Sequence, residues 1–189
     1  MELRPPDPPL EDGVVRLRPW TLADVPDVTR ICQDPEIPRW TLVPSPYTEA
    51  DARGWIETHG SSWTDHAAFA IVAADDGRLI GSSSAWLVRP RVLELGYWCA
   101  AEERGRGFVP RAVALLSAWA FDELDAARVQ LGTLPGNTAS ERVAEKVGFR
   151  REGVLRDYLE QEGEPTDMLM WSLLPGELVQ PGQTDRSRA

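Results

Sequence analysis

The stretch Arg104-Gly105-Arg106-Gly107-Phe108-Val109 decides the fold, because the character of the sequence changes there. Three strand-like segments lie before it and are separated by turn residues: Ala67 to Ala74, Leu79 to Val88 and Val92 to Ala100. Turns near Gly77 and Pro90 are short enough to join neighbouring strands. The three segments therefore predict an antiparallel meander that leads into the glycine-bearing turn.

A helix and a further strand are predicted after the turn. Apolar residues recur there at helical spacing, at Val113, Leu116, Ala120 and Leu124. Arg128 to Leu134 then has the pattern of a short strand. Strand, glycine turn, helix and strand together make one βαβ unit.

The turn has the composition of a phosphate-binding site. The first N–H groups of a helix have no partner inside it, and Gly105 and Gly107 let the backbone approach an anion closely. Arg104 and Arg106 add positive charge, and Pro110 suits a first helical turn. The same letters alone fit a basic surface loop, but the flanking strand and helix favour a phosphate site. A Walker-type phosphate loop is excluded because no Gly-Lys-Ser/Thr follows, and a Rossmann dinucleotide-binding motif is excluded because no third glycine follows at the right distance.

Charge and composition narrow the class of partner. The formal net charge is -10, which disfavours nucleic acid and anionic membranes. Three arginines nevertheless lie between Arg104 and Arg111 with no acidic residue among them, which predicts a small polyanion as ligand. No apolar run is long enough to span a bilayer, and the N-terminus lacks a signal-peptide core. We expect a cytoplasmic protein.

The 189 residues predict one domain with two short tails. Residues 1–12 are rich in proline and charge and predict a mobile N-terminal arm. Residues 13–175 carry the periodic segments, and residues 176–189 predict a flexible C-terminal tail.

The first third of the domain predicts one strand and two helices. Apolar and basic residues alternate from Val14 to Pro19, as they do in a strand with one buried face. A helix is expected over about 22–33. Thr21 and Asp24 have the spacing of a capping box. A proline-rich loop then leads to a second helix over about 48–58.

The last third predicts a capped helix and two strands. Asn137 or Thr138 begins a helix that reaches Val147, and Gly148 has the place of a C-cap glycine. Strands are expected near 149–158 and 168–174.

Metal and disulfide sites find little support. Cys32 and Cys99 lie in apolar surroundings without metal-ligand spacing and are predicted to be buried free thiols. His59 and His66 have no partner arranged around them, so neither is assigned a role. No metal is expected.

Five motifs follow one another in an order that resembles the GCN5-related N-acetyltransferase (GNAT) superfamily. Within it, the chain is similar to the branch of ribosomal-protein N-terminal acetyltransferases of the RimJ and RimL type. The resemblance covers about residues 12–175. Its motifs are Glu94-Leu-Gly-Tyr-Trp-Cys, Arg104-Gly-Arg-Gly-Phe-Val, Asn137-Thr-Ala-Ser140, Glu145-Lys-Val-Gly-Phe149 and Glu152-Gly-Val-Leu-Arg.

The resemblance implies the GNAT fold, of the α/β (α+β) class. Its central splayed sheet is mixed, mostly antiparallel, with six to seven strands and about four flanking helices. The pantetheine arm of coenzyme A would lie between two diverging strands. The family motif is Arg-x-x-Gly-x-Gly/Ala, and Val109 stands where the family has a small residue. Valine keeps the main-chain N–H that binds phosphate, so we expect binding with slight crowding.

The resemblance further implies acetyl-CoA as co-substrate. Asn137 resembles the contact to pantetheine or adenosine, and a plain helix cap is the alternative. The implied cofactor-binding residues are Trp98, Cys99, Ala100, Arg104, Gly105, Arg106, Gly107, Phe108, Val109, Asn137 and Ser140.

The implied reaction is direct attack of an amine on the thioester, with main-chain N–H groups of 97–101 stabilising the oxyanion. Glu94 is the favoured base, because alternation places it on one sheet face with Gly96 and Trp98. Rival bases are Asp157, Glu160 or a water chain. Ser140 is the first candidate for the acid and Tyr158 the second.

The acceptor is predicted to be a primary amine of low pKa, foremost a protein N-terminal α-amine. Deprotonating lysine costs about 3 kcal/mol more. Acetylation of a small-molecule amine, or succinylation aided by Arg89 and Arg91, is the alternative, and a non-catalytic coenzyme A-binding module is a third. The eight tryptophans fit core anchors, an aromatic acceptor pocket or a homodimer interface.

Overall fold

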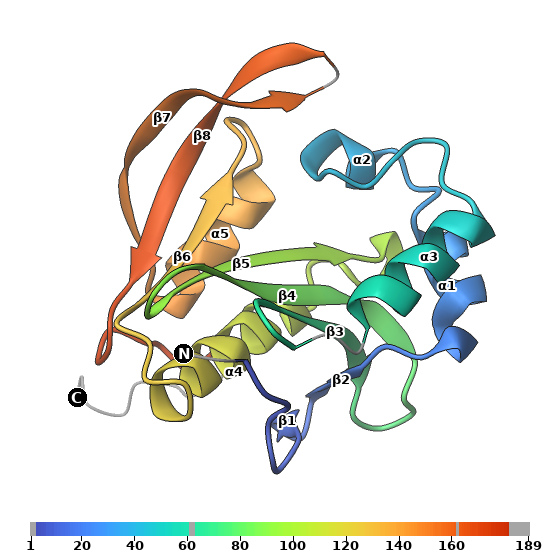
Figure 1. Ribbon diagram of the computed structural model, residues 1–189, viewed down its shortest axis with the longest axis horizontal. Helices are drawn as coiled ribbons and strands as arrows, with labels where there is room; N and C mark the ends of the chain where they lie inside the picture. Colours follow the sequence, from blue (N-terminus) through green and yellow to red (C-terminus); the bar gives the residue numbers. More distant parts are fainter. Residues whose placement is uncertain (1–2, 61–62, 162, 182–189) are drawn as a thin grey trace.

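The computed structural model describes residues 3–60, 63–161 and 163–181 (Figure 1). Two 3-10 turns, η1 and η2, accompany the helices and strands. In chain order the elements are β1 (Leu10–Glu11), β2 (Val15–Pro19), η1 (Leu22–Asp24), α1 (Val25–Ile31), α2 (Glu36–Trp40), α3 (Glu49–His59), β3 (His66–Ala73), β4 (Leu79–Arg89), β5 (Val92–Cys99), η2 (Ala101–Glu103), α4 (Phe108–Asp122), β6 (Arg128–Thr133), α5 (Thr138–Val147), β7 (Arg150–Gln161) and β8 (Glu164–Leu173).

The strands of the described residues form one mixed sheet in the order β1-β2-β3-β4-β5-β6-β8-β7. Each neighbouring pair is antiparallel except β5 and β6, which are parallel. The predicted fold class is therefore confirmed. The sheet has eight strands instead of six or seven because the short β1 was not foreseen.

Helices cover both faces of the sheet (Figure 1). Phe69 and Ile71 of β3 pack in the core cluster that contains Trp119 of α4, while Ala68 and Ala70 pack in the cluster under α1 and α3. The rings of Phe69 and Trp119 meet edge to face at 5.9 Å. This double coverage explains why β3 is buried along its whole length.

The two halves of the sheet separate at one point. Parallel pairing joins β5 to β6 only from Val92↔Arg128 to Glu94↔Gln130. Beyond this pair β5 continues to Cys99 beside β4, and β6 continues to Thr133 beside β8. The predicted splay is thus present, with the fork at Glu94 and Gln130.

Residues near both termini contact the domain. Leu3 is only 2% exposed and belongs to the main core cluster, and β1 pairs with β2. The proline-rich composition concealed these contacts, and the mobility of the N-terminal arm stays a prediction. At the other end Val179 donates a backbone hydrogen bond to Val147 at 2.9 Å. The predicted flexibility of 182–189 lies outside the described residues.

Local signals placed most helix ends correctly. The predicted capping box forms at Thr21 with Asp24, and a second one forms at Thr48 with Asp51. Gly148 ends α5 in the left-handed conformation with φ 98°. The loop expected after the first helix instead contains the five-residue α2, which tolerates Pro38 because proline lies in its first turn.

The packing of Leu3 generates a stability prediction. We expect Leu3→Ala to lower the free energy of unfolding by about 2–3 kcal/mol, because it removes a buried side chain from the core. Leu22→Ala, at a residue that is 47% exposed, should cost less than about 1 kcal/mol. Urea denaturation of both variants measures the difference. Equal small losses would show that the N-terminal segment does not support the core.

Candidate functional site

The glycine turn presents a row of unused main-chain donors. Gly107 is the N-cap of α4 with φ 82°, and Gly105 has φ 75°. Within the described chain, none of the N–H groups from Gly105 to Val109 donates a hydrogen bond. A Cβ added at either glycine would meet nothing within 4 Å, so the turn is open on that side. This arrangement suits an anion with several oxygens.

The arginines of the turn do not form a free cationic patch, contrary to the sequence expectation. Each of them meets a carboxylate that is distant in sequence or precedes the turn. The ion pairs are Arg104 with Asp34 at 2.5 Å, Arg106 with Glu103 at 2.6 Å and Arg111 with Asp12 at 2.6 Å. The groups of this turn that are left for an anion are therefore its main-chain N–H groups, at the N-terminus of the helix.

The unusual valine of the turn points away from the open side. Val109 is 9% exposed and lies in the main core cluster, as does Phe108. The guanidinium of Arg106 lies over the Phe108 ring, 4.9 Å from its centre, and this cation–π contact stabilises the turn. Crowding by the Val109 side chain is thus directed into the core.

Beyond Glu94, the edge of β5 that faces the opening between β5 and β6 has no strand partner, although the Cys99 carbonyl there accepts a hydrogen bond from Arg104 Nη2 at 3.1 Å. Ala100 donates its N–H to Ile80 on β4 at 2.9 Å. Because hydrogen-bonding direction alternates along a strand, the N–H of Trp98 also points to β4, whereas those of Tyr97 and Cys99 point into the opening. Of the predicted Trp98 to Ala100 contacts, only Cys99 can offer its N–H there.

The opening is bounded on one side by α5. The side chain of Asn137 accepts a hydrogen bond from the N–H of Ser140 at 3.1 Å. Asn137 therefore caps this helix, which was the alternative to its contact with the coenzyme. The hydroxyls of Ser140 and Tyr97 are 2.7 Å apart, with either as donor. Burial raises the pKa of Tyr97, so its phenol stays protonated. The main-chain N–H of Tyr97 was among the predicted oxyanion donors, but its side chain, which lies on the sheet face opposite Glu94, was not predicted as part of the site.

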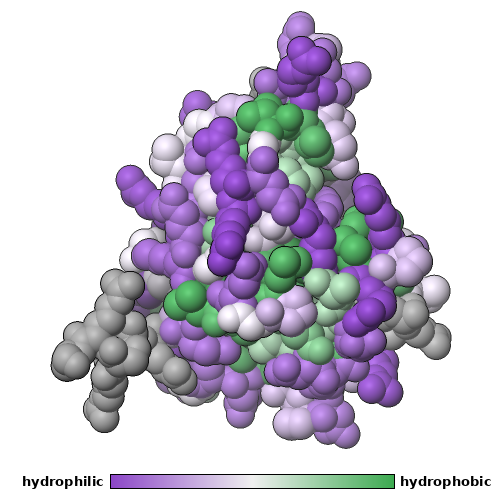
Figure 2. All heavy atoms as spheres, turned by 90° about the vertical axis from the view of Figure 1, so that its left-hand side faces the viewer, coloured by the Kyte–Doolittle hydropathy of each residue, from purple (hydrophilic) through white to green (hydrophobic). Residues whose placement is uncertain are grey.

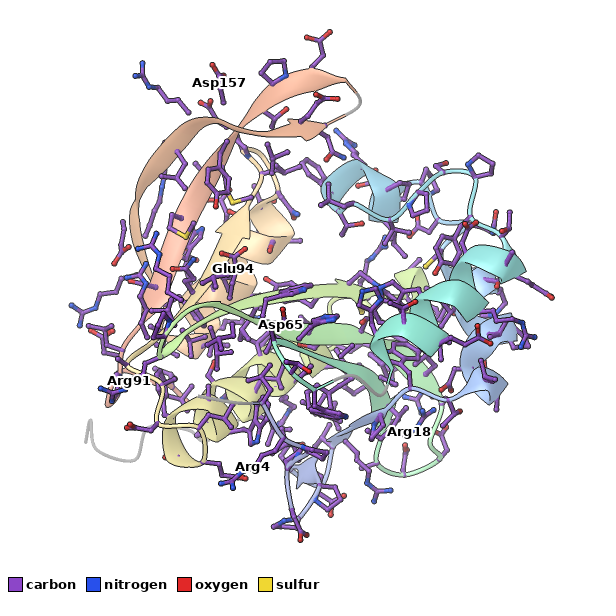
Figure 3. The ribbon with its side chains drawn as sticks, viewed as in Figure 1. Arg4, Arg18, Asp65, Arg91, Glu94 and Asp157 are labelled. Carbon is purple, nitrogen blue, oxygen red and sulfur yellow. The ribbon has the colours of Figure 1, made fainter. Side chains whose placement is uncertain are left out.

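Glu94 lies at the fork of the sheet (Figure 3). Its partner across β6 is Gln130, whose Nε2 donates to Glu94 Oε2 at 2.7 Å. Glu94 is therefore held where β5 and β6 separate. It was the only charged residue predicted on the sheet face of Gly96 and Trp98. Gln130 was missed because only the fold brings it within reach of Glu94, 36 positions away.

Aromatic side chains cover the same sheet face beside Glu94. A Cβ on Gly96 would lie 2.8 and 2.9 Å from Cζ3 and Cη2 of Trp86, so this indole lies over the glycine. On β3, the residue paired with Trp86 is His66. Its ring stacks on the Trp86 ring, with the ring centres 4.9 Å apart and an angle of 7° between the planes. Burial lowers the pKa of His66 to about 4, with His59 adding to the shift, so His66 is neutral at pH 7. Trp86 itself is 39% exposed.

The remaining candidates lie on the β7–β8 hairpin. Asp157 lies at the bend of β7, away from Glu94 (Figure 3), and its N–H donates to Asp167 Oδ1 at 3.0 Å. Tyr158 is 53% exposed, and its hydroxyl has no hydrogen bond in the described chain, so it is not a core residue. Glu160 instead lines a cavity of about 310 Å³, together with Pro38, Thr41, Leu42, Val43, Ser45 and Gln161.

The outer side of the hairpin is mostly hydrophilic with separate apolar patches (Figure 2). Val154 and Tyr158 of β7 are among the exposed large apolar residues of the described chain. A homodimer interface stays a prediction.

The cysteines differ from each other in exposure. Cys32 is buried as predicted, whereas Cys99 is partly exposed. Burial raises the pKa of Cys32 to about 12 and that of Cys99 to about 11, so both are thiols at pH 7.

The described residues contain no group of three or more potential metal ligands. Among those same residues, every helix is too short or too polar to cross a membrane.

Known proteins resemble the chain in both sequence and structure. The Bacillus subtilis "Probable N-acetyltransferase YjcK" is 35% identical over 109 residues, which are 56% of this chain and 60% of the relative. YdaF of the same organism, provisionally named a ribosomal N-acetyltransferase, is 40% identical over 87 residues, 46% of this chain and 48% of YdaF. The chain thus matches about half of each relative's length.

A solved structure extends the likeness to nearly the whole chain. Mycobacterium smegmatis RimJ, in complex with CoA-disulfide, superposes with a TM-score of 0.76 at 27% identity. The alignment covers 95% of this chain and 88% of the RimJ chain. Residues 15–150 match the acetyltransferase (GNAT) domain family, and the chain therefore belongs to that family.

Proposed function

We propose that the protein is an acetyl-CoA-dependent N-acetyltransferase that transfers the acetyl group to a primary amine, foremost a protein N-terminal α-amine. One observation carries the proposal. The opening between β5 and β6 has an unpaired strand edge along it, the donor row of Gly105 to Val109 beyond the end of β5, and Glu94 at its fork.

The donor row would bind the pyrophosphate. The groups that fit it are the N–H groups of Gly105 to Val109, which have no other acceptor in the described chain. The pantetheine amides would pair with the free edge of β5, as an added strand pairs with a sheet. Asn137 would contribute its amide nitrogen, because its oxygen already caps α5. The bound thioester supplies the acetyl group.

Three groups of the chain would carry the reaction. Glu94 accepts the proton that the amine loses while the new N–C bond forms. The N–H groups of Tyr97 and Cys99, which point into the opening, stabilise the oxyanion. As the C–S bond breaks, the Ser140 hydroxyl donates a hydrogen bond to the departing thiolate, which takes its proton from solvent, and Glu94 later releases the amine's proton to solvent. The Tyr97 hydroxyl at 2.7 Å holds Ser140 in place.

An α-amine suits this site better than a lysine side chain. Its pKa near 8 leaves about one-tenth of it neutral at pH 7, so a single carboxylate suffices as base. The name of YdaF, a ribosomal N-acetyltransferase, agrees with an acceptor on a ribosomal protein. The net charge of -10 favours a cationic acceptor of either size.

A small-molecule amine is the second candidate. The cavity of about 310 Å³ beside Glu160 is large enough for a compact ligand. Succinyl transfer gains no support at Arg91, because its guanidinium is bound to Asp125 at 2.9 Å.

A thiol-release assay with acetyl-CoA tests the proposed function. We expect turnover with peptides that have a free N-terminus and none with the same peptides after Nα-acetylation, even if they contain lysine. Aminoglycosides, polyamines and free amino acids complete the panel. Turnover confined to these small amines would favour the second candidate. Acetyl-CoA binding without turnover of any amine would identify a non-catalytic module.

The glycine turn predicts a specific loss of coenzyme binding. Gly107→Ala should weaken coenzyme A binding about tenfold, because alanine in the left-handed conformation costs roughly 1–2 kcal/mol and so disfavours the turn that presents the N–H groups. Gly77→Ala is the matched control, since Gly77 has φ 75° and equally open space in the β3–β4 turn. Calorimetric titration and melting curves measure both variants. Equal loss of affinity in the two would refute a site at Gly107.

The Ser140 hydroxyl predicts an effect on turnover. Ser140→Ala should lower kcat about tenfold, a modest factor because a thiolate leaves readily, with little change in the KM for acetyl-CoA. Ser117→Ala removes a buried hydroxyl of α4 that bonds only to Val113 at 2.8 Å, and it should keep kcat. Steady-state kinetics decide. An unchanged kcat for Ser140→Ala would remove Ser140 from the reaction.

A further inference from the structure

We infer that Gln130 is a positioning residue that fixes the Glu94 carboxylate for proton transfer from the acceptor amine. This inference rests on the proposed function, since it concerns the same site. It assigns a role to a side chain outside the motifs that carry the family resemblance.

Gln130 occupies the last parallel pair before the sheet opens. Glu94↔Gln130 is the final register pair of β5 and β6. Directly opposed residues place their side chains on the same sheet face, so the two side chains meet above the fork. Their hydrogen bond of 2.7 Å therefore closes the base of the opening.

The orientation of the Gln130 amide is determined by a second contact. Arg128 donates from Nε to Gln130 Oε1 at 3.1 Å. An arginine can only donate, so the atom it meets must be the amide oxygen and the amide nitrogen must face Glu94. Glu94 Oε2 accepts that N–H, and Glu94 Oε1 has no hydrogen bond from the described residues. One carboxylate oxygen is thus held while the other is left for the amine.

Arg128 is itself fixed by an ion pair across the sheet. Its two terminal nitrogens donate to the two oxygens of Glu152 on β7 at 2.8 and 2.7 Å. Ser172 of β8 donates to the same carboxylate at 2.7 Å. The hydrogen bonds from Arg128 and Ser172 lower the pKa of Glu152 to about 2, so this pair stays charged across the working range of pH. Because Glu152 neutralises Arg128, the network orients Gln130 without adding net positive charge beside Glu94.

The network has a consequence for the reaction. A carboxylate on a flexible glutamate must otherwise lose rotational freedom when the amine arrives. With Gln130 in place, that freedom is already lost in the free enzyme, so removing the donor should lower kcat more than it weakens acetyl-CoA binding. A merely structural role in the sheet would instead lower the melting temperature and leave kcat intact.

A double-mutant cycle separates these roles. The variants are Gln130→Met, which keeps the length of the side chain without its donor, Glu94→Gln, and the two combined. Gln180→Met, at an exposed C-terminal position, is the matched control. Each full-length variant is assayed for kcat, the KM for acetyl-CoA and melting temperature with the peptide that the wild-type protein acetylates best.

We expect Glu94→Gln to lower kcat about 100-fold and Gln130→Met about tenfold, both with an unchanged KM for acetyl-CoA. The combined variant should match Glu94→Gln within about threefold, because Gln130 acts only through Glu94. Losses that multiply, or a Gln130→Met variant with wild-type kcat beside an impaired Glu94→Gln, would overturn the inference. A wild-type protein that acetylates no peptide would contradict the proposed function instead.

Discussion

The site depends on the end of hydrogen bonding between β5 and β6 after Glu94 and Gln130. Each strand is held on its other edge, β5 by β4 as far as Cys99 and β6 by β8 as far as Thr133. Their inner edges are therefore kept apart by the rest of the sheet and do not collapse on each other. Unpaired backbone groups at such an edge require partners, and an extended ligand with amides can supply them. The fork thus creates the opening between β5 and β6 and also fixes where the Glu94 carboxylate lies.

The donor turn follows from the same divergence. β5 ends at Cys99, and the short η2 carries the chain directly into the N-terminus of α4. The ion pair of Arg104 with Asp34, which follows α1, ties this turn to the opposite helical layer. Positive charge at the turn therefore serves to hold its shape, while the unsatisfied N–H groups remain for an anion.

Sequence predicted the elements whose signals are local. Apolar periodicity gave the meander and α4, and capping residues placed α3 and α5. It failed where the signal was long-range or ambiguous. Prolines concealed α2, and the pairing of β1 depends on a partner strand. The ion pair of Arg111 with Asp12 and the bond of Gln130 to Glu94 join residues far apart in the chain, so no local pattern contains them.

The two sides of the fork divide the chemistry between them. Beside Glu94 the face of β4 and β5 is aromatic, and Trp86 can lie over the strand only because Gly96 has no Cβ. The neutral His66 behind that indole adds no charge that would repel a cationic amine. On the β6 side, polar side chains form the chain of hydrogen bonds from Ser172 to Gln130. In the proposed reaction, an apolar wall with one oriented carboxylate would favour loss of a proton from the amine, because a charged amine is poorly solvated there while its proton acceptor is already in place.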